Sequence, residues 1–130
     1  MLNWWAVLIC AVFNVGFGFL WYGPIFGRAW RSATLRKTDA DLSPGLTAYV
    51  VVICGALVGA VVLATVISFL RVYTWWSGMV WGAALSFGFA DSAILTHGVF
   101  EGLRPRLSVL FIGYIVIAYA VQGALFAVWR

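Results

Sequence analysis

The chain has 130 residues, of which 65% are hydrophobic and only 9% are charged, and its net charge is +4. Soluble domains are about half apolar and a quarter charged, so this composition excludes an ordinary water-soluble fold. A positive charge can indicate nucleic acid binding. Here, however, the basic residues lie in short connections between apolar runs, where orientation in a membrane and anionic lipid headgroups explain them better. We therefore expect the lipid bilayer as a partner, and no nucleic acid.

Four long apolar runs occupy most of the chain, at about residues 2–22, 45–70, 74–97 and 107–129. Each is near or above the ~20 residues that cross a bilayer as a helix. Helices satisfy their own backbone hydrogen bonds in lipid, and the runs lack the polar–apolar alternation of a membrane barrel. The sequence predicts an all-α membrane fold, a four-transmembrane-helix bundle that forms a single domain over residues 1–130.

The start of the chain is expected to remain in the mature protein. Residues 1–20 lack the basic region and the Ala-x-Ala site of a cleaved signal peptide. Cys10 and Cys54 lie near the starts of two spans that run in opposite directions, so they fall at different depths. We expect two buried free cysteines, not a disulfide.

The first apolar run ends where helix-breaking, aromatic and basic residues follow one another. Pro24 has no amide hydrogen and clashes with the carbonyl group four residues back, so a helix is not expected to continue past Gly23. Tryptophan and tyrosine suit the headgroup level, and arginines just beyond can reach lipid phosphates. We expect a short interfacial segment here, formed by Trp21, Tyr22, Gly23, Pro24, Phe26, Arg28 and Trp30.

Two proline-containing pairs are expected to start later helices. Residues 31–43 form the most polar segment, and Ser43 followed by Pro44 has the residue types of a helix N-cap and first helical position. Arg104 followed by Pro105 is interpreted in the same way before the fourth span.

The basic residues predict the orientation. The first and third connections hold Arg28, Arg31, Arg36, Lys37, Arg104 and Arg106, whereas the opposite side has only Arg71 and Arg130. The positive-inside rule then makes the first and third connections cytoplasmic and puts both termini outside. Aromatic residues would form an outer belt of Trp4, Trp5, Tyr73, Trp75, Trp76 and Trp129, and an inner belt of Trp21, Tyr22, Trp30 and Tyr49.

Small residues recur along the third span. Gly78, Gly82, Ser86 and Ala90 are spaced four residues apart, and Ala83 and Ala93 lie close to the same arc. Such a surface lets another helix approach closely. Packing within the bundle is the favoured interpretation, and a face for a homo-oligomer is the alternative.

With the spans in place, the chain resembles a family of small four-helix bacterial membrane proteins known as domain of unknown function 1761. The resemblance is carried by Asn3-Trp4, by Gly18 to Trp30 with its Trp-Tyr-Gly-Pro block, by Phe100-Glu101-Gly102, by Gly113-Tyr114 and by Gly123 to Trp129. It implies a multi-pass protein of the bacterial cytoplasmic (inner) membrane. It implies no activity.

Four polar residues form the candidate intramembrane site: Asp91, Asn14, His97 and Tyr114. A carboxyl group at membrane depth is expected to be protonated or paired. Asp91 is therefore interpreted either as a proton or cation site or as a structural contact with Arg28, Arg106 or a hydroxyl group. The structural contact is favoured.

Asn14 should lie at a depth close to that of Asp91, and Tyr114 lies on the same side of the membrane. We expect that Asn14 and Asp91 could meet across helices, with Tyr114 also on the inner side, whereas Gln122 lies in the outer half of its span. Hydrogen bonding between helices is the simplest account of these polar residues.

His97 follows Asp91 by six residues, which places the two about 120° apart around a helix, so they form no dyad. An interfacial histidine is favoured over a ligand for metal, haem or pigment, and no cofactor is expected. Glu101, Arg104 and Arg106 form a charged loop. This loop is interpreted either as an ion pair between the two cytoplasmic connections or as a lipid-headgroup contact.

The sequence has no phosphate-binding loop, metal-ligand cluster or nucleophile with a spaced base, so no enzyme is expected. Two hypotheses remain. The first is a non-enzymatic association module, as a homo-oligomer or an accessory subunit of a membrane complex. The alternative is a small transporter or ligand-binding bundle with a site near Asp91 and Asn14.

Overall fold

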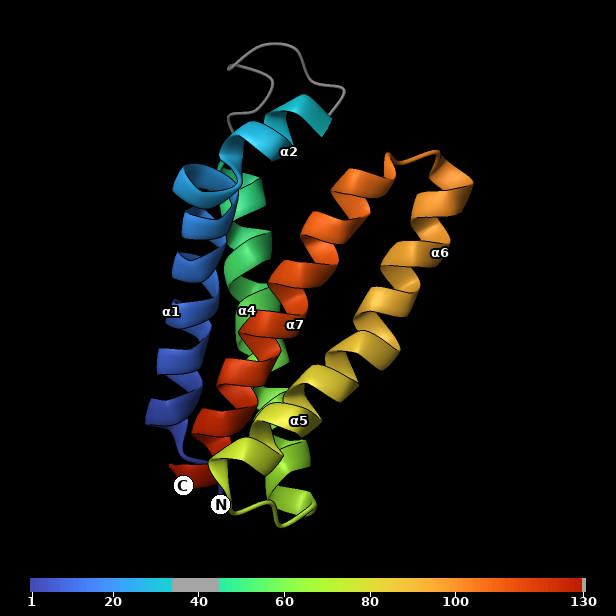
Figure 1. Cartoon of the computed structure of the whole chain (residues 1–130). Helices are drawn as coiled ribbons and strands as arrows, with labels where there is room; N and C mark the ends of the chain where they lie inside the picture. The colour runs from blue at the N-terminus through green and yellow to red at the C-terminus, as the bar shows by residue number, and fades with distance from the viewer. Residues whose placement is uncertain (34–44, 130) are drawn as a thin grey trace.

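The computed structural model describes residues 1–33 and 45–129, which form helices joined by short turns (Figure 1). Four helical segments are long and apolar enough to cross a membrane: Trp4–Ile25, Leu46–Phe69, Trp75–Glu101 and Pro105–Val128. The predicted four-helix membrane fold is confirmed. The observed spans begin or end a few residues from their predicted limits, and the third reaches Glu101 instead of ending at His97. Arg36, Lys37, Ser43, Pro44 and Arg130 lie outside the described residues.

The first span does not end at Gly23 as expected. Helix α1 (Trp4–Leu20) begins at Asn3, whose side-chain oxygen accepts hydrogen bonds from the amides of Trp5 and Ala6. A π-helical turn, η1 (Trp21–Ile25), then carries the chain through Pro24, and α2 (Gly27–Ala33) follows. The amide of Phe26 donates to the carbonyl of Trp21 over 2.9 Å. The wider turn relieves the clash between the proline ring and the preceding carbonyl groups, so the helix bulges instead of stopping.

Helix α4 (Leu46–Phe69) begins after an N-cap at Gly45, two residues later than the Ser43–Pro44 pair predicted. Residues 46–55 are all exposed, and only the second half of α4 contributes buried side chains to the core. There Ala60, Leu63 and Ile67 pack with residues of α1 and of the last span. Cys10 belongs to this core, but Cys54 is exposed, so only one of the two free cysteines is buried as expected.

The third span consists of three parts: α5 (Trp75–Leu85), a second π-helical turn η2 (Ser86–Asp91), and α6 (Ser92–Glu101). It ends at Gly102, which adopts φ +70°, a left-handed conformation that favours glycine. Helix α7 (Pro105–Val128) then starts at the predicted Arg104–Pro105 pair, with proline in the first turn.

The backbones of α5 and α7 contact each other where the two helices cross. A Cβ atom added at Gly82 would overlap the carbonyl oxygen of Tyr119, and one added at Gly78 would overlap that of Gly123. The small-residue surface of the third span is thus filled by α7, which confirms packing within the bundle. The surface ends earlier than predicted, because η2 changes the helical register and leaves Ala93 exposed.

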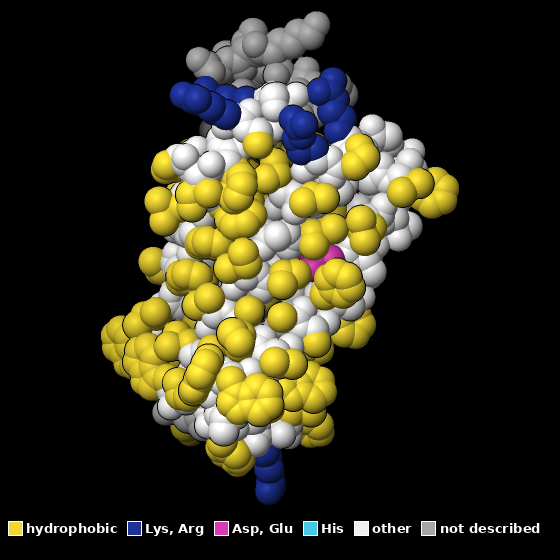
Figure 2. All heavy atoms as spheres, viewed as in Figure 1, with side chains coloured by type: hydrophobic (Ala, Val, Ile, Leu, Met, Phe, Trp, Pro, Cys, Tyr) yellow, Lys and Arg dark blue, Asp and Glu magenta, His cyan; other side chains and the backbone are white. Residues whose placement is uncertain are grey.

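The two ends of the bundle differ in charge (Figure 2). Arginine side chains gather at the end that carries α2, while hydrophobic side chains cover the middle. At this end the Arg104 guanidinium donates to the carbonyl of Ser32 over 3.0 Å, so the first and third connections touch. The other end holds both chain termini (Figure 1) and the expected outer aromatic residues, which are exposed: Trp4, Trp5, Tyr73, Trp75, Trp76 and Trp129.

Candidate intramembrane polar site

Tyr114 on α7 is hydrogen-bonded to Asn14 on α1, so Asn14 meets Tyr114 instead of the expected Asp91. Its hydroxyl group lies 2.8 Å from the Asn14 backbone carbonyl and 2.5 Å from the side-chain oxygen Oδ1. Asn14 is buried, and the Tyr114 ring stacks on Phe17 with centroids 5.5 Å apart. This contact joins the first and last spans through a buried asparagine and a half-buried tyrosine.

The expected interfacial segment lies partly inside the bundle. Trp21 donates from its indole nitrogen to the carbonyl of Leu110 on α7 over 3.1 Å, and Tyr22 packs on Tyr114 and Phe111. Trp21 and Tyr22 are half-buried for this reason, and their place at the headgroup level stays a prediction. We call the connected rings the aromatic cluster: Phe13, Phe17, Trp21, Tyr22, Phe26, Trp30, Phe111 and Tyr114.

Asp91 ends the π-helical turn η2 and is 0% exposed. Neither of its carboxylate oxygens has a hydrogen-bond partner among the described residues. In a straight α-helix Asp91 would lie roughly 180° from Gly82, on the face away from α7, because each residue turns the chain by about 100°. The wider π-turn rotates it toward the buried side.

The partners predicted for Asp91 are not found. The side-chain oxygen of Asn14 accepts from Tyr114 instead, and Arg28 and Arg106 are both exposed. His97 does not contact Asp91 either. This agrees with the helical spacing, which put the two side chains on different faces of the helix. The structure therefore separates the four candidate residues into a bonded pair, Asn14 and Tyr114, a buried carboxyl group and an exposed histidine.

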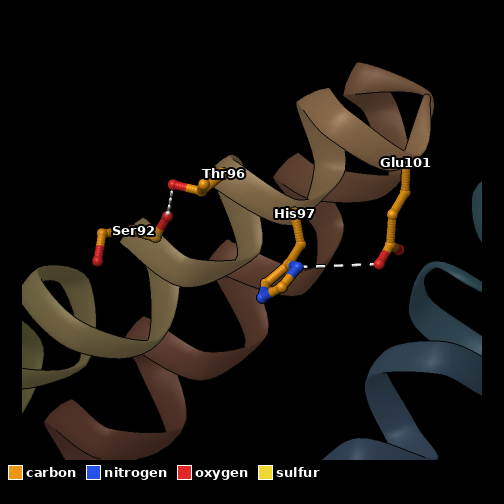
Figure 3. Close-up of polar contacts among 4 residues, drawn as sticks. All are labelled: Ser92, Thr96, His97 and Glu101. Carbon is orange, nitrogen blue, oxygen red and sulfur yellow. Dashed lines mark hydrogen bonds and ion pairs between the residues drawn. The ribbon is translucent and has the colours of Figure 1, made fainter.

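Helix α6 carries its polar side chains on the outside (Figure 3). The side chains of His97 and Glu101 are 74% and 64% exposed, and Nδ1 of His97 lies 3.8 Å from Oε1 of Glu101. The Thr96 hydroxyl donates to the carbonyl of Ser92 over 2.9 Å. An ion pair between the two connections, one of the two interpretations of this loop, is not seen among the described residues. Glu101 faces His97, and Arg104 joins the connections through the backbone carbonyl of Ser32 instead.

Gln122 is a buried polar residue that the candidate site did not include. It is 0% exposed, and neither the oxygen nor the nitrogen of its amide has a hydrogen-bond partner among the described residues. The sequence did point to Gln122, because a glutamine is unusual within so apolar a run. Its lack of a partner, however, depends on which side chains α1 and α5 place beside it. Among the described residues, no three His, Cys, Asp or Glu side chains are grouped to hold a metal ion.

The fold and these buried polar groups define a four-span α-helical membrane protein. A family model described as "Protein of unknown function (DUF1761)" matches residues 5–127, so the chain belongs to that family, as its sequence motifs indicated. No curated protein and no solved structure matches the chain.

Proposed function

We propose that this protein is a small, non-enzymatic binding or transport bundle in which the carboxyl group of Asp91 takes up a proton or a small cation. The observation that carries this proposal is a fully buried carboxyl group without a hydrogen-bond partner among the described residues. An unpaired carboxylate at the centre of a membrane helix is unfavourable by about 2.5–3.5 kcal/mol on insertion scales. A bound proton or cation removes this penalty.

The surrounding backbone supports the same function. Asp91 is held at the end of η2, and π-helical turns occur frequently at functional sites. Ionisable side chains within membrane spans commonly belong to ion or proton pathways. The α5–α7 glycine contact fixes one side of η2, whereas α6 on its other side is mostly exposed. A change in the state of Asp91 would therefore move α6 more easily than α5.

Infrared spectroscopy of the protein in liposomes tests the bound proton directly. In sodium-free buffer we expect the C=O band of a neutral carboxyl group, which Asp91→Asn removes and Glu101→Gln, at an exposed carboxylate, leaves in place. Loss of the band on adding sodium chloride would identify a cation instead. Identical spectra for the wild type and Asp91→Asn, with and without sodium, would contradict the proposal.

Transport is tested separately in liposomes that enclose a pH-sensitive dye. Under an imposed membrane potential, we expect proton or sodium-coupled flux to fall to the rate of empty liposomes in Asp91→Asn and to stay unchanged in Glu101→Gln. Flux that persists in Asp91→Asn would restrict the role of this residue to structure.

A second function, association with other membrane helices, is supported by α6. Polar side chains in membrane proteins normally face the bundle, yet α6 directs Ser92, Thr96 and His97 outward. A helix from a second copy or from a larger complex would cover them better than lipid tails. The small-residue surface no longer supports this function, because α7 fills it.

Cross-linking tests the association. In a Cys10→Ser, Cys54→Ser background, we expect Thr96→Cys to form disulfide-linked dimers in native membranes, and Val109→Cys to remain monomeric. Val109 is the matched control, since it is exposed on α7 and lies a similar number of residues from the same connection. Equal cross-linking of both variants would contradict a specific interface at α6.

The charge distribution and the family resemblance support a location and an orientation for the protein. We propose the bacterial cytoplasmic membrane, with the arginine-bearing end inside and both termini outside. Helix α2, with Arg28 and Arg31, lies at this end (Figure 1), and Arg104 and Arg106 lie beside it at the start of α7. We propose that these arginines bind anionic lipid headgroups.

A further inference from the structure

Helix α6 carries an imidazole and a carboxylate that face each other from successive turns (Figure 3). Nδ1 of His97 lies 3.8 Å from Oε1 of Glu101, which is too far for a hydrogen bond. Two ligand atoms of one tetrahedral metal ion lie roughly 3.4 Å apart, because the bonds from zinc to nitrogen and oxygen are about 2.1 Å long. The imidazole and the carboxylate are therefore spaced almost as two ligands of a single metal ion would be.

The other polar groups of this face are bonded within the helix. The Ser92 hydroxyl donates to the carbonyls of Gly88 and Phe89, and the Thr96 hydroxyl donates to the carbonyl of Ser92. The side chains of His97 and Glu101 are instead mostly exposed. Glu101 is the last residue of α6, beside the connection to α7, so an ion can reach this pair of side chains without crossing the hydrocarbon.

One chain supplies two of the four ligands that a tetrahedral metal ion takes. Within the described part of the chain, no group of three His, Cys, Asp or Glu side chains could complete the set. A second copy supplies two more ligands. Copies with the same charge difference between their ends insert in the same direction, and a two-fold axis along the membrane normal then brings the same residues of both copies to the same depth.

Charge favours a cation in this arrangement. Two α6 helices packed in this way bring their Glu101 carboxylates close to each other, and like charges at short distance repel. A divalent cation between the helices compensates both carboxylates. Imidazole and carboxylate groups are also ordinary ligands of zinc.

We propose that two copies of this chain associate through α6 and share one divalent transition-metal ion, with Zn²⁺ as the probe, bound by His97 and Glu101 of each copy. This inference rests on the proposed association at α6. It commits that association to a second copy of the chain and gives it a metal ion as its ligand.

The metal site is separate from Asp91. Asp91 lies ten residues before Glu101 in the sequence, roughly 15 Å along the helix at 1.5 Å per residue. Glu101→Gln should therefore weaken the binding of zinc and leave the carboxyl group of Asp91 unaffected. The proposals for the two sites can fail independently.

Calorimetric titration with Zn²⁺ in mild detergent tests the site. The protein is purified without a histidine tag, because His97 is its one histidine. We expect one zinc ion for two chains in the wild type. His97→Ala and Glu101→Gln each remove two of the four ligands, so zinc should bind at least about tenfold more weakly to both variants. Ser92→Ala, on the same face, is the matched control and should bind zinc as the wild type does.

The oligomeric state distinguishes the metal bridge from the association itself. Analytical ultracentrifugation should show wild-type dimers with zinc, and monomers after EDTA is added or in either ligand variant. Circular dichroism shows that the variants are folded. One zinc ion for each chain, no zinc binding by the wild type, or unchanged binding by both ligand variants would overturn the shared site. Dimers that persist in EDTA and in both variants would overturn the metal bridge alone, whereas a wild type that stays monomeric with zinc would overturn the association as well.

Discussion

The Tyr114 hydroxyl group shows how single side chains hold spans together in this bundle. It donates to Asn14 while its ring stacks within the aromatic cluster, so one residue combines a polar and an apolar contact between α7 and α1. Hydrogen bonds between membrane helices contribute about 0.6 kcal/mol on average and up to about 1.7 kcal/mol. Two acceptors lie within reach of this one hydroxyl group, so we expect a contribution within that range.

Replacing Tyr114 with phenylalanine tests this contact. Tyr114→Phe keeps the ring and removes the hydroxyl group, so we expect the free energy of unfolding to fall by about 1 kcal/mol. Unfolding in mixed micelles at increasing SDS measures it. Tyr49→Phe, at an exposed tyrosine, is the control and should change little. A Tyr114→Phe variant as stable as the wild type would show that the bond adds nothing to stability.

At the same scale, the sequence brought Asn14 and Tyr114 to the same side of the membrane, where they are bonded, whereas the partners expected for Asp91 are not found among the described residues. The first two lie on regular helical segments, where the spacing of residues fixes depth and face. Asp91 lies at the end of a π-turn, and one wider turn moves a side chain by about 100° around the axis. No residue type in Ser86–Asp91 indicates a π-helical turn. The turn follows the part of α5 that packs against α7.

At the scale of elements, the closest approach is between α5 and α7. Gly78 and Gly82 on one helix face Gly123 and the backbone of Tyr119 on the other, with no room for a side chain between them. The four-residue spacing of small residues predicted that another helix would pack closely on the third span. It did not predict which helix that would be. The bulge at Pro24 was less predictable, because proline can either end a helix or widen it, and the aromatic contacts of Trp21 and Tyr22 with α7 favour the second.

A single methyl group at this crossing should separate the helices. Gly82→Ala places a Cβ atom against the carbonyl oxygen of Tyr119, so we expect a loss of roughly 1–3 kcal/mol, as for other overpacked positions. Gly55→Ala is the matched control, since no atom lies within 4 Å of the added Cβ atom. It should leave stability unchanged or raise it by up to about 1 kcal/mol. The same SDS titration measures both, and equal stability of the two variants would contradict the contact.

At the scale of the whole molecule, charge separates the two ends of the bundle. Arg104 ties the third connection to the end of α2, and the neighbouring arginines lie at the same end. Short connections rich in arginine stay on the cytoplasmic side of the membrane. The four spans and their order were predictable, because the lengths and positions of the apolar runs in the sequence determine both. The exposure of residues 46–55 was not, since apolar residues facing lipid and apolar residues facing protein look alike in sequence.

Cysteine labelling in intact bacteria measures the orientation. In the Cys10→Ser, Cys54→Ser background, we expect Thr74→Cys, between α4 and α5, to react with a membrane-impermeant maleimide. Glu101→Cys, before α7, should react only after the cells are opened. Both positions are exposed, so accessibility to the reagent depends on the side of the membrane. Labelling of Glu101→Cys in intact cells would reverse the orientation.

The hydrogen bond between Tyr114 and Asn14 also has a consequence for biosynthesis. The two residues are 100 positions apart, so during translation Asn14 enters the membrane long before its partner has been made. Until the last span arrives, the first must keep a buried amide among lipid tails or beside the insertion machinery. Completion of the chain, and not insertion of its first helix, is therefore the moment at which this protein acquires its final arrangement.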